Sequence, residues 1–351
     1  MGLIQLYNAD WRGVASTRVC PLSDCSSALV RREINGEYSL TATLPKGAAF
    51  ANEVTIGRAI KSAVNEAGNV QAFIVKRRNR NLTGGMTIYA EHQSYIYNGI
   101  LLGGNTANPG GSVKTVFNST RTYAVPSITD IATWTYSRAN GLTADFPERP
   151  GPMTVTQILK DFLVANAGGE LILDGFNVEY VDAMGSDNGA FYRYGVNLTE
   201  METEDILDGY ASGIYPYWGR AGDADRPLTT ITNKVYNFTG TFPLQVIVPV
   251  DFSDKFDTQP SEADLLAACA EYESLNAPSG FLMSIRAARA KIAGDTSVDL
   301  GDTVTVTNTP WGLSQHTRIV ALTFDALKGR VQDVELGTIN PGFAGAVKNM
   351  K

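Results

Sequence analysis

The sequence has few residues that bind metals or perform acid–base catalysis, and it has no long apolar run. It contains three cysteines and only two histidines, His92 and His316, which lie far apart in the chain. A zinc site uses mainly histidine and cysteine ligands, so a centre of that kind is nearly excluded. No segment approaches the ~18 consecutive apolar residues of a membrane-spanning helix. Residues 1–7 lack the basic segment of a signal peptide, so we expect assembly in a cytoplasm.

The three cysteines cannot form a disulfide framework. Cys20 and Cys25 could bridge each other, but Cys269 would be left over on the apolar side of a predicted helix. We therefore expect reduced thiols, as is usual for proteins of a reducing compartment.

Strong positive charge is also missing, because the net charge is −7 without a long charged block. Proteins that bind nucleic acid in a groove usually present a basic face, so this class is disfavoured. The one basic cluster is formed by Arg77, Arg78 and Arg80. It follows an apolar run at 72–76 and precedes a glycine-containing turn. We therefore expect a solvated hairpin end rather than a phosphate site.

The common catalytic signatures fail in turn. Glu91-His92 is not followed by a second histidine at metalloprotease spacing, and neither Gly-x-Ser-x-Gly nor Gly-x-Gly-x-x-Gly occurs. Residues 110–115 have the residue types of a phosphate-binding loop, but Lys114 does not directly follow the second glycine. A flexible interdomain loop is the favoured interpretation of this segment. The sequence therefore predicts no catalytic, cofactor-binding or metal-binding residue.

Two acidic segments keep other functions open. The run from Glu200 to Asp208 could supply paired carboxylates for glycoside hydrolysis, although a solvated connector is favoured. Asp223 and Asp225 could contact calcium, but the glycine and glutamate of an EF-hand loop are missing downstream.

An aromatic set could serve carbohydrate binding. Tyr215, Tyr217 and Trp218 lie close together in the sequence and could stack on a sugar ring. Positions in a barrel core or at an interface are the commoner fate of such residues.

The alternation of apolar and polar residues dominates both ends of the chain and is typical of strands with one buried face. Alternation is strict at 38–44, after Asn35-Gly36, which predicts a tight hairpin. The closing blocks at 298–306, 317–325 and 328–337 alternate in the same way around turns. The 34 glycines and 15 prolines punctuate short apolar runs, which favours many strands over long helices.

Two helices are predicted between these ends. Thr154 is a suitable N-cap for the first helix, which should stop at residues 166–169. The second spans 261–275, where Ser261 and Asp264 resemble a capping box.

A chain of 351 residues can hold two or three cores. We expect a mainly β protein in which two small antiparallel β-barrels, related by a pseudo-repeat, flank a middle α+β module. An insertion at 241–280, within the second barrel, should pack with the middle module. The predicted ranges are 1–100 for the first barrel, 101–202 for the middle module, 203–240 and 281–345 for the two parts of the second barrel, 241–280 for the insertion and 346–351 for a tail.

Several stretches resemble the tail-tip hub proteins of bacteriophages, a family that includes baseplate hubs and the N-terminal module of tail-associated (endopeptidase tail) proteins. Residues 36–45, 71–75 and 88–95 resemble its early hairpin and the strand pair that follows. Residues 168–198 resemble its middle domain, and residues 300–337 its closing barrel. The positions that carry the resemblance, all structural, are Gly36, Tyr38, Leu40, Phe73, His92, Gly169, Tyr194, Gly195, Asn197, Leu300, Gly301, Asp302, Asp325 and Gly337.

The resemblance implies a homotrimer at the tip of a phage or prophage tail. Two barrels per chain would form a pseudo-hexameric ring that joins a six-fold tail tube to a three-fold tip and lets DNA pass without specific binding. The implied partners are a distal tail protein or tube ring, a tape measure protein and any separate spike, fibre or lysin, without a membrane anchor or a cofactor.

Some family members continue into a peptidase or lysozyme domain, whereas this chain stops at Lys351. We therefore expect a structural protein and not an enzyme. The alternatives are a β-rich carbohydrate-binding receptor or adhesin and, less favoured, a tail-associated peptidoglycan hydrolase.

Overall fold

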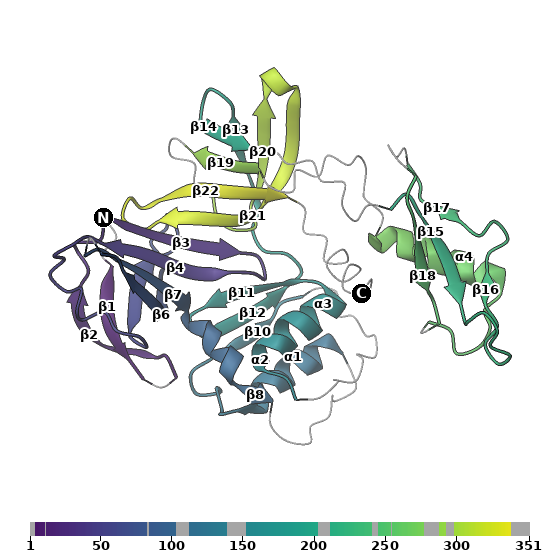
Figure 1. Cartoon of the computed structure of the whole chain (residues 1–351), viewed down its shortest axis with the longest axis horizontal. Helices are drawn as coiled ribbons and strands as arrows, with labels where there is room; N and C mark the ends of the chain where they lie inside the picture. The colour runs from purple at the N-terminus through teal and green to yellow at the C-terminus, as the bar shows by residue number, and fades with distance from the viewer. Residues whose placement is uncertain are drawn as a thin grey trace. The chain divides into compact units, whose positions relative to one another are not determined.

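The chain folds into two compact units (Figure 1). Unit 1 comprises Met1–Thr203 and Ala287–Thr338, and unit 2 comprises Glu204–Arg286 and Ile339–Lys351. The computed structural model describes residues 4–10, 12–82, 84–102, 112–138, 152–202, 211–240, 245–253, 255–276, 288–292 and 298–337.

Unit 1 contains a large sheet that joins strands from both ends of the chain. Its strands are β1 (Gln5–Ala9), β2 (Ala15–Pro21), β3 (Ser27–Glu33), β4 (Tyr38–Leu44), β5 (Ala59–Ala63), β6 (Val70–Arg80), β7 (Met86–His92), β13 (Asp187–Arg193), β14 (Leu198–Glu202), β19 (Ala288–Ile292), β20 (Thr303–Asn308), β21 (Leu313–Asp325) and β22 (Arg330–Gly337). The order is β14-β19-β22-β21-β3-β4-β7-β6-β5-β1-β2, and β20 pairs with β21 and β13.

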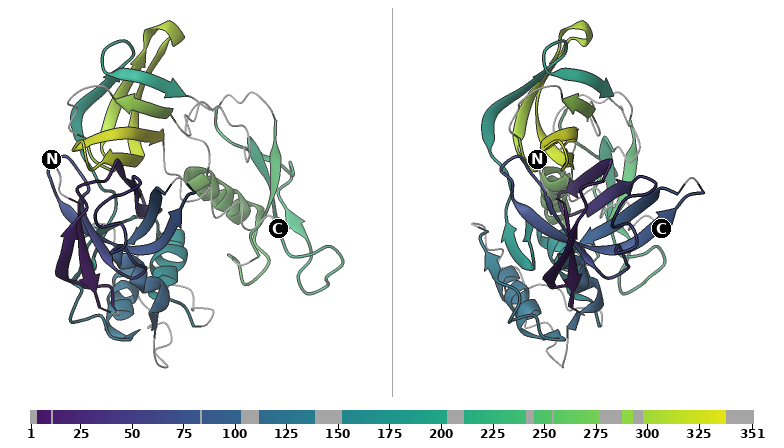
Figure 2. Two further views of the ribbon diagram at one scale, coloured as in Figure 1. Left: turned by 60° about the vertical axis from the view of Figure 1, so that its left-hand side comes forward. Right: turned by 90° about the vertical axis from the view of Figure 1, so that its left-hand side faces the viewer.

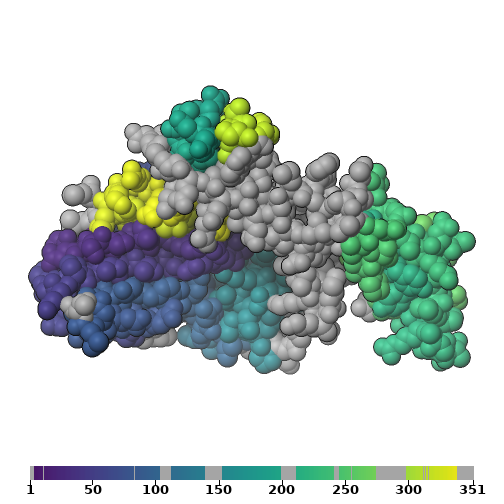
Figure 3. All heavy atoms as spheres, turned by 45° about the horizontal axis from the view of Figure 1, so that its top comes forward, coloured from purple at the N-terminus to yellow at the C-terminus, as the bar shows by residue number. Residues whose placement is uncertain are grey.

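The antiparallel pairing of β3 with β21 connects the N-terminal strands to the closing strands, with Val30 opposite Phe324. Both side chains are fully buried, because alternation directs them to one face of the sheet. Figure 3 shows the N-terminal strands, in purple, and the closing strands, in yellow, adjacent on the surface. The predicted mainly β fold is confirmed. The pairings among the described residues form an open path, so closure into two barrels stays a prediction.

The predicted hairpin at Asn35-Gly36 is confirmed. It joins β3 to β4, with Arg32 opposite Tyr38 nearest the turn. Asn35 has a φ of 54°, a left-handed conformation that asparagine tolerates better than most residues.

The middle of unit 1 is an α+β module with helices packed on a small sheet (Figure 2). Its strand order is β10-β12-β11. Its elements are η1 (Gln93–Gly99), β8 (Leu101–Leu102), α1 (Val113–Thr122), β9 (Ala124–Val125), β10 (Trp134–Tyr136), α2 (Val155–Gln157), the π-helical turn η2 (Ile158–Val164), α3 (Ala165–Ala167), β11 (Glu170–Asp174) and β12 (Asn177–Val181). The N-cap at Thr154 is confirmed, and Gln157 completes a capping box with it.

Helix α1 corrects the prediction of a flexible loop at 110–115. Ser112 caps the helix by accepting a hydrogen bond from the backbone N–H of Thr115. Val113, Val116 and Phe117 are buried at the spacing of one helical face. That periodicity was readable in the sequence, whereas residues 110 and 111 of the predicted loop lie outside the described residues.

The ends of the middle module also differ from the prediction. Strands β13 and β14 were assigned to it as part of 101–202, but they pair with β20 and β19 of the large sheet. Pairing between strands distant in sequence decides this, and strand alternation by itself does not specify the partner.

The described part of unit 2 is a four-stranded sheet with one helix. Its elements are β15 (Gly213–Trp218), β16 (Thr229–Thr230), β17 (Tyr236–Asn237), β18 (Ile247–Asp251) and α4 (Glu262–Asn276). Its core includes Ile214 and Leu265. The capping box at Ser261 and Asp264 is confirmed, because each backbone N–H donates to the other residue's side chain.

The predicted division at residue 240 needs correction, since the sheet of unit 2 crosses it. Ile214 in β15 lies opposite Val248 in β18, so the range 203–240 shares its sheet with part of 241–280. The proposed packing of 241–280 against the middle module stays a prediction, and the range 346–351 lies outside the described residues. None of the helices in the described ranges is long and apolar enough to span a bilayer.

Candidate functional site

Three of the motifs singled out in the sequence meet in unit 1. They are the Asn35-Gly36 turn, the segment 168–170 at the start of β11, and the loop 299–302 before β20. We call this meeting point the junction. It connects the N-terminal strands, the middle module and the closing strands.

The side chain of Asn35 ties the hairpin to β11. Its Nδ2 donates to the carbonyl oxygen of Gly169 at 3.0 Å, and its Oδ1 accepts the N–H of Leu171 at 2.9 Å. The amide thereby pairs with the edge of β11 as a neighbouring strand would. The turn thus has a second role besides reversing the chain.

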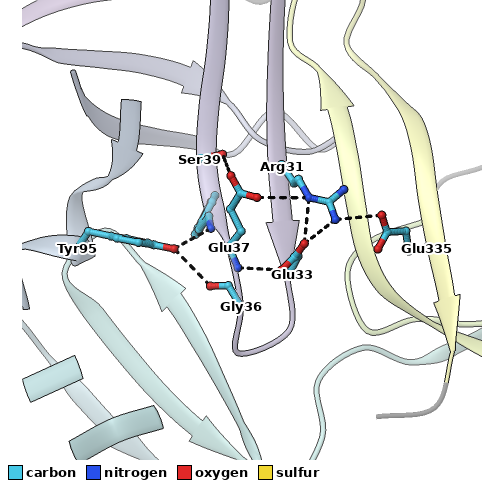
Figure 4. A network of polar contacts seen from close by, with 8 residues as sticks. Arg31, Glu33, Gly36, Glu37, Ser39, Tyr95 and Glu335 are labelled. Carbon is cyan, nitrogen blue, oxygen red and sulfur yellow. Dashed lines mark hydrogen bonds and ion pairs between the residues drawn. The ribbon is translucent and has the colours of Figure 1, made fainter. Parts of the chain in front are cut away.

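The carbonyl of Gly36 is a second connection between the hairpin and the middle module. It accepts a hydrogen bond from Lys160 Nζ at 3.0 Å and one from the Tyr95 hydroxyl at 3.4 Å. The Tyr95 hydroxyl, labelled in Figure 4, also accepts the backbone N–H of Tyr38 at 3.1 Å. The hairpin therefore sits on residues of η1 and η2.

Arg31 and three glutamates form the neighbouring polar network of Figure 4. Arg31 on β3 contacts Glu33, Glu37 and Glu335, with its Nη2 3.0 Å from Glu335 Oε1 on β22. This ion pair spans the first and closing strands. The network was not predictable from the sequence, because Glu335 lies 304 positions from Arg31.

The Glu170–Arg318 pair closes the other side of the junction. Arg318 Nη1 and Nη2 contact the two Glu170 oxygens at 2.5 and 2.7 Å, and Arg318 Nε donates to the carbonyl of Gly301 at 2.7 Å. Glu170 is 5% exposed. Neither charged residue was a sequence candidate. The sequence signal that could have identified Glu170 is its position directly after two glycines, at the start of an apolar strand.

Gly301 lies where two backbones cross closely. Its φ is +89°, and a Cβ there would lie 2.6 Å from the carbonyl oxygen of Met184. Asp302 supports the crossing, since its two oxygens accept the N–H groups of Ser186 and Asp299 at 2.9 and 2.8 Å. Leu300 lines a cavity at the junction. All three motif positions of this loop therefore belong to the junction.

Gly169 is constrained in a similar way. Its φ is +84°, and a Cβ would lie 2.8 Å from both the Tyr180 ring and the carbonyl oxygen of Val181. Glycine meets both conditions, because it adopts a positive φ readily and has no Cβ to collide with these atoms.

His92 is buried in an aromatic cluster beside the junction. Its ring stacks on Tyr38 at a centroid distance of 4.1 Å, and Phe73 meets it edge-on. His92 Nε2 donates to Gln71 Oε1 at 3.1 Å, because that oxygen can only accept, and Nδ1 accepts from the hydroxyl of Ser94 at 2.9 Å. Burial lowers the pKa of His92 to about 3. The imidazole is therefore neutral and fully hydrogen-bonded.

The remaining motif positions lie outside the junction. Leu40 is fully buried in β4, and Gly337 lies opposite Arg318 in the pairing of β21 with β22. Asp325 organises the β21–β22 turn, where it accepts the N–H groups of Leu327 and Lys328, both at 3.1 Å.

Tyr194, Gly195 and Asn197 form the turn between β13 and β14. Asn197 accepts the N–H of Arg193 at 2.8 Å and donates to the carbonyl of Phe191 at 2.7 Å. These contacts shape the turn itself and, among the described residues, do not extend to the junction.

The basic cluster differs from its predicted form, because β6 extends through Arg80 instead of ending before it. Arg77 lies over the ring of Tyr89, 4.5 Å from its centroid. Arg78 donates to the carbonyl oxygen of Val54 at 2.7 Å. These side chains are exposed on the strand, as a solvated site requires.

The residues of the alternative functions have other roles in unit 2. Trp218 is 1% exposed and donates to the carbonyl of Phe256 at 2.9 Å, so its ring is not available to stack on a sugar. Asp223 accepts the N–H groups of Asp225 and Arg226, which lower the pKa of its carboxyl. Within the described ranges no three His, Cys, Asp or Glu residues gather as metal ligands would.

Of the acidic run at 200–208, Glu200 and Glu202 lie in β14, and residues 203–208 lie outside the described residues. Cys20, Cys25 and Cys269 are free and buried, as predicted. Desolvation raises the pKa of the Cys25 and Cys269 thiols to about 11, so both stay protonated at neutral pH.

Comparisons with known proteins were made for sequence and for fold. No protein-family model matches the chain, and no curated protein matches it. Solved structures do match. The chain is similar to the prophage tail protein gp18 of Listeria monocytogenes EGD-e, with a TM-score of 0.61 and 13% identity, over 99% of this chain and 98% of that one.

Two further tail proteins match over a similar extent. The 43 kDa tail protein of prophage MuSo2 from Shewanella oneidensis has a TM-score of 0.62 and 10% identity, over 97% of this chain and 99% of that one. A tail protein of Neisseria meningitidis MC58 has a TM-score of 0.61 and 13% identity with the same coverage. The chain therefore has the fold of these phage-type tail proteins, which confirms the resemblance read from the sequence at the level of the fold.

Proposed function

We propose that this protein is a structural component of a phage or prophage-derived tail, and that it forms the hub of the tail tip. The observation that carries the proposal is the likeness in fold to three tail proteins over 97–99% of the chain. A likeness over nearly the whole length covers both ends of the chain and the modules between them. It therefore exceeds what one shared small domain would give.

The internal bonding of unit 1 supports a mechanical role. The pairing of β3 with β21, the Arg31–Glu335 contact and the Glu170–Arg318 pair each connect segments that are distant in sequence. A connector between a tube and a tip must transmit force without separating its parts. Cross-connections of this kind between the ends of the chain suit that task.

We further propose that the hub is a homotrimer at the virion tail tip. The two predicted barrels of each chain would contribute to a ring that joins a six-fold tube to a three-fold tip. The partners would be a distal tail protein or tube ring, a tape measure protein and any separate spike, fibre or lysin. The role is structural rather than enzymatic.

Size and symmetry test this proposal directly. Light scattering on the purified chain should give three times its 37.8 kDa, and negative-stain microscopy should give a three-fold ring that co-assembles with tail tubes. A monomer that binds glycans saturably would favour the receptor alternative instead. Release of peptidoglycan fragments by the pure protein would support the hydrolase.

The charge of the chain bears on the channel. Because the net charge is −7, a trimer carries a threefold larger negative charge, and we propose a neutral-to-acidic channel wall that lets DNA pass. Phosphate contacts release counterions and gain affinity as salt falls. Tight, salt-sensitive binding of duplex DNA to the ring at low salt would contradict this arrangement.

A further inference from the structure

A cavity of about 260 Å³ lies at the junction, entirely within unit 1. Its walls combine apolar side chains with two cationic side chains and three acidic ones, Glu33, Asp299 and Asp302. The apolar wall includes Tyr38, Leu171, Leu173, Met184 and Leu300, and the cationic side chains are Arg32 and Lys160.

The acidic groups in the lining already have donors from the protein. Both oxygens of Glu33 accept hydrogen bonds from the β3–β4 hairpin. Both oxygens of Asp302 accept backbone N–H groups. Asp299 accepts from Arg32 and from Asn65 Nδ2. The carboxylates of the cavity therefore offer little capacity to bind a ligand's donors.

The cationic groups, in contrast, retain donors. An ammonium has three N–H donors, and the Lys160 contact within hydrogen-bond range that the structure gives is the carbonyl of Gly36. Asp161 and Glu33 act on the Lys160 charge from longer range, beyond the ion-pair distances of the described residues. Burial lowers the pKa of this ammonium, because removal from water disfavours its charge. Arg32 Nε is buried without a hydrogen-bond partner within the described ranges, and Arg32 Nη2 already pairs with Asp299, so Lys160 is the cation available to a ligand.

We propose that the junction cavity binds a carboxylate joined to a compact apolar group. The carboxylate would accept from Lys160, and the apolar group would contact Leu171, Leu173 and Leu300. Hydrogen bonds between ionised partners are the strong class, and a bound carboxylate would supply the charge that Lys160 lacks. The volume lies just below that of pockets for drug-sized ligands, which limits the group to about the size of one amino-acid side chain.

Two sources share this chemistry. One is a free small carboxylic acid, and the other is the C-terminal residue of a polypeptide that ends in an apolar side chain. Either ligand would contact the hairpin, β11 and the loop 299–302 at once, so its binding would stabilise the folded form of unit 1.

The experiment uses the full chain and defined probes. N-acetyl-L-leucine is compared with its neutral amide by calorimetry and thermal unfolding, and a six-residue peptide ending in leucine is compared with its C-terminally amidated form. We expect an acid to bind at least about tenfold more tightly than its amide, since only the acid presents a charged acceptor. Binding of both acids assigns a free acid as a sufficient ligand, and binding of the peptide alone assigns a chain terminus.

Matched variants locate the site. Lys160→Met should weaken binding of the acid at least about tenfold, whereas Lys114→Met should leave it unchanged, because Lys114 lies over Tyr136 in the same module and does not line the cavity. Lys160→Arg should retain binding, and Leu173→Phe should block it by filling the cavity. These two variants decide the question if Lys160→Met does not fold.

Three results would overturn the proposal. The first is that neither acid binds detectably at ~10 mM. The second is equal affinity for the acids and their amides. The third is an unchanged affinity for the acid in Lys160→Met or Leu173→Phe. The oligomeric state measured in the same samples reports separately on the tail hub, so failure of one proposal does not imply failure of the other.

Discussion

Glu170 on β11 and Arg318 on β21 form a two-point ion pair between residues that are 148 positions apart in the sequence. The glutamate side chain is 7% exposed and the arginine side chain 22% exposed. Arg318 also reaches the carbonyls of Gly301 and Met184. One guanidinium thus connects the middle module to two segments near the closing strands.

Removal of one partner of this pair should be strongly destabilising. Glu170→Ala leaves a largely buried guanidinium without its carboxylate, and we expect a loss of about 3–4 kcal/mol in the free energy of unfolding, measured with urea. Glu53→Ala, which breaks an exposed pair with Arg58, is the control and should cost less than about 1 kcal/mol. Equal losses in the two variants would contradict a buried pair.

The buried His92 should make stability depend on pH. Its pKa is lowered from 6.5 to about 3 by burial, so the unfolded chain binds a proton below pH 6.5 that the folded chain does not accept. This contribution to stability is complete above pH 6.5 and is lost as the pH falls towards 3. The expected loss is roughly 1–2 kcal/mol between pH 7 and pH 5.

The same pH series on two variants assigns that effect. His92→Asn should reduce the slope of stability against pH, although it also lowers stability at pH 7. His316→Asn changes an exposed histidine whose side chain is 57% accessible, and it should keep the slope. A slope that is unchanged in His92→Asn would show that other groups cause it.

The Asn35 amide can be tested apart from the turn conformation. Asn35→Gly keeps the left-handed conformation but loses both hydrogen bonds to β11, and we expect a loss of about 1–2 kcal/mol. Asn35→Asp keeps the acceptor for Leu171 and loses the donor to Gly169, so its loss should differ from that of the glycine variant. Hydrogen exchange of the Leu171 amide measures the contact locally. Unchanged protection in Asn35→Gly would refute the bridge.

Helix α4 offers two adjacent leucines with different environments. Leu265 is fully buried and Leu266 is 40% exposed. Leu265→Ala should therefore cost about 2–5 kcal/mol, and Leu266→Ala less than about 1 kcal/mol, in thermal unfolding of unit 2. Phe162→Ala in the middle module, where Phe162 is 6% exposed, should resemble Leu265→Ala. A large loss in Leu266→Ala would indicate that another surface covers this side chain.

Local sequence patterns were sufficient for the parts of the fold that are set by neighbouring residues. The Asn35-Gly36 hairpin, the Thr154 cap and the Ser261–Asp264 capping box were all predictable, because turn and cap chemistry acts over a few residues. Helix α1 is equally local, but the loop-like residues at 110–115 overlap its first turn and mask the periodicity that follows.

Long-range partners were not readable from the same patterns. Alternation identifies a strand and its buried face, but it does not say that β3 pairs with β21 or that β18 joins β15. For this reason the assignment of 187–202 to the middle module and the division at 240 differ from the observed pairing, whereas unit 1 ends at Thr203, beside the predicted boundary at 202.

The sequence by itself determined the strand-rich character, the local turns and caps, and the resemblance to phage tail hubs. Tertiary structure alone decided the junction, since Glu170, Lys160 and Arg318 acquire their roles only when segments from three parts of the chain meet. The physical reason is that a charged side chain affects stability most when it is buried and has no alternative partner. Both conditions are properties of the folded chain.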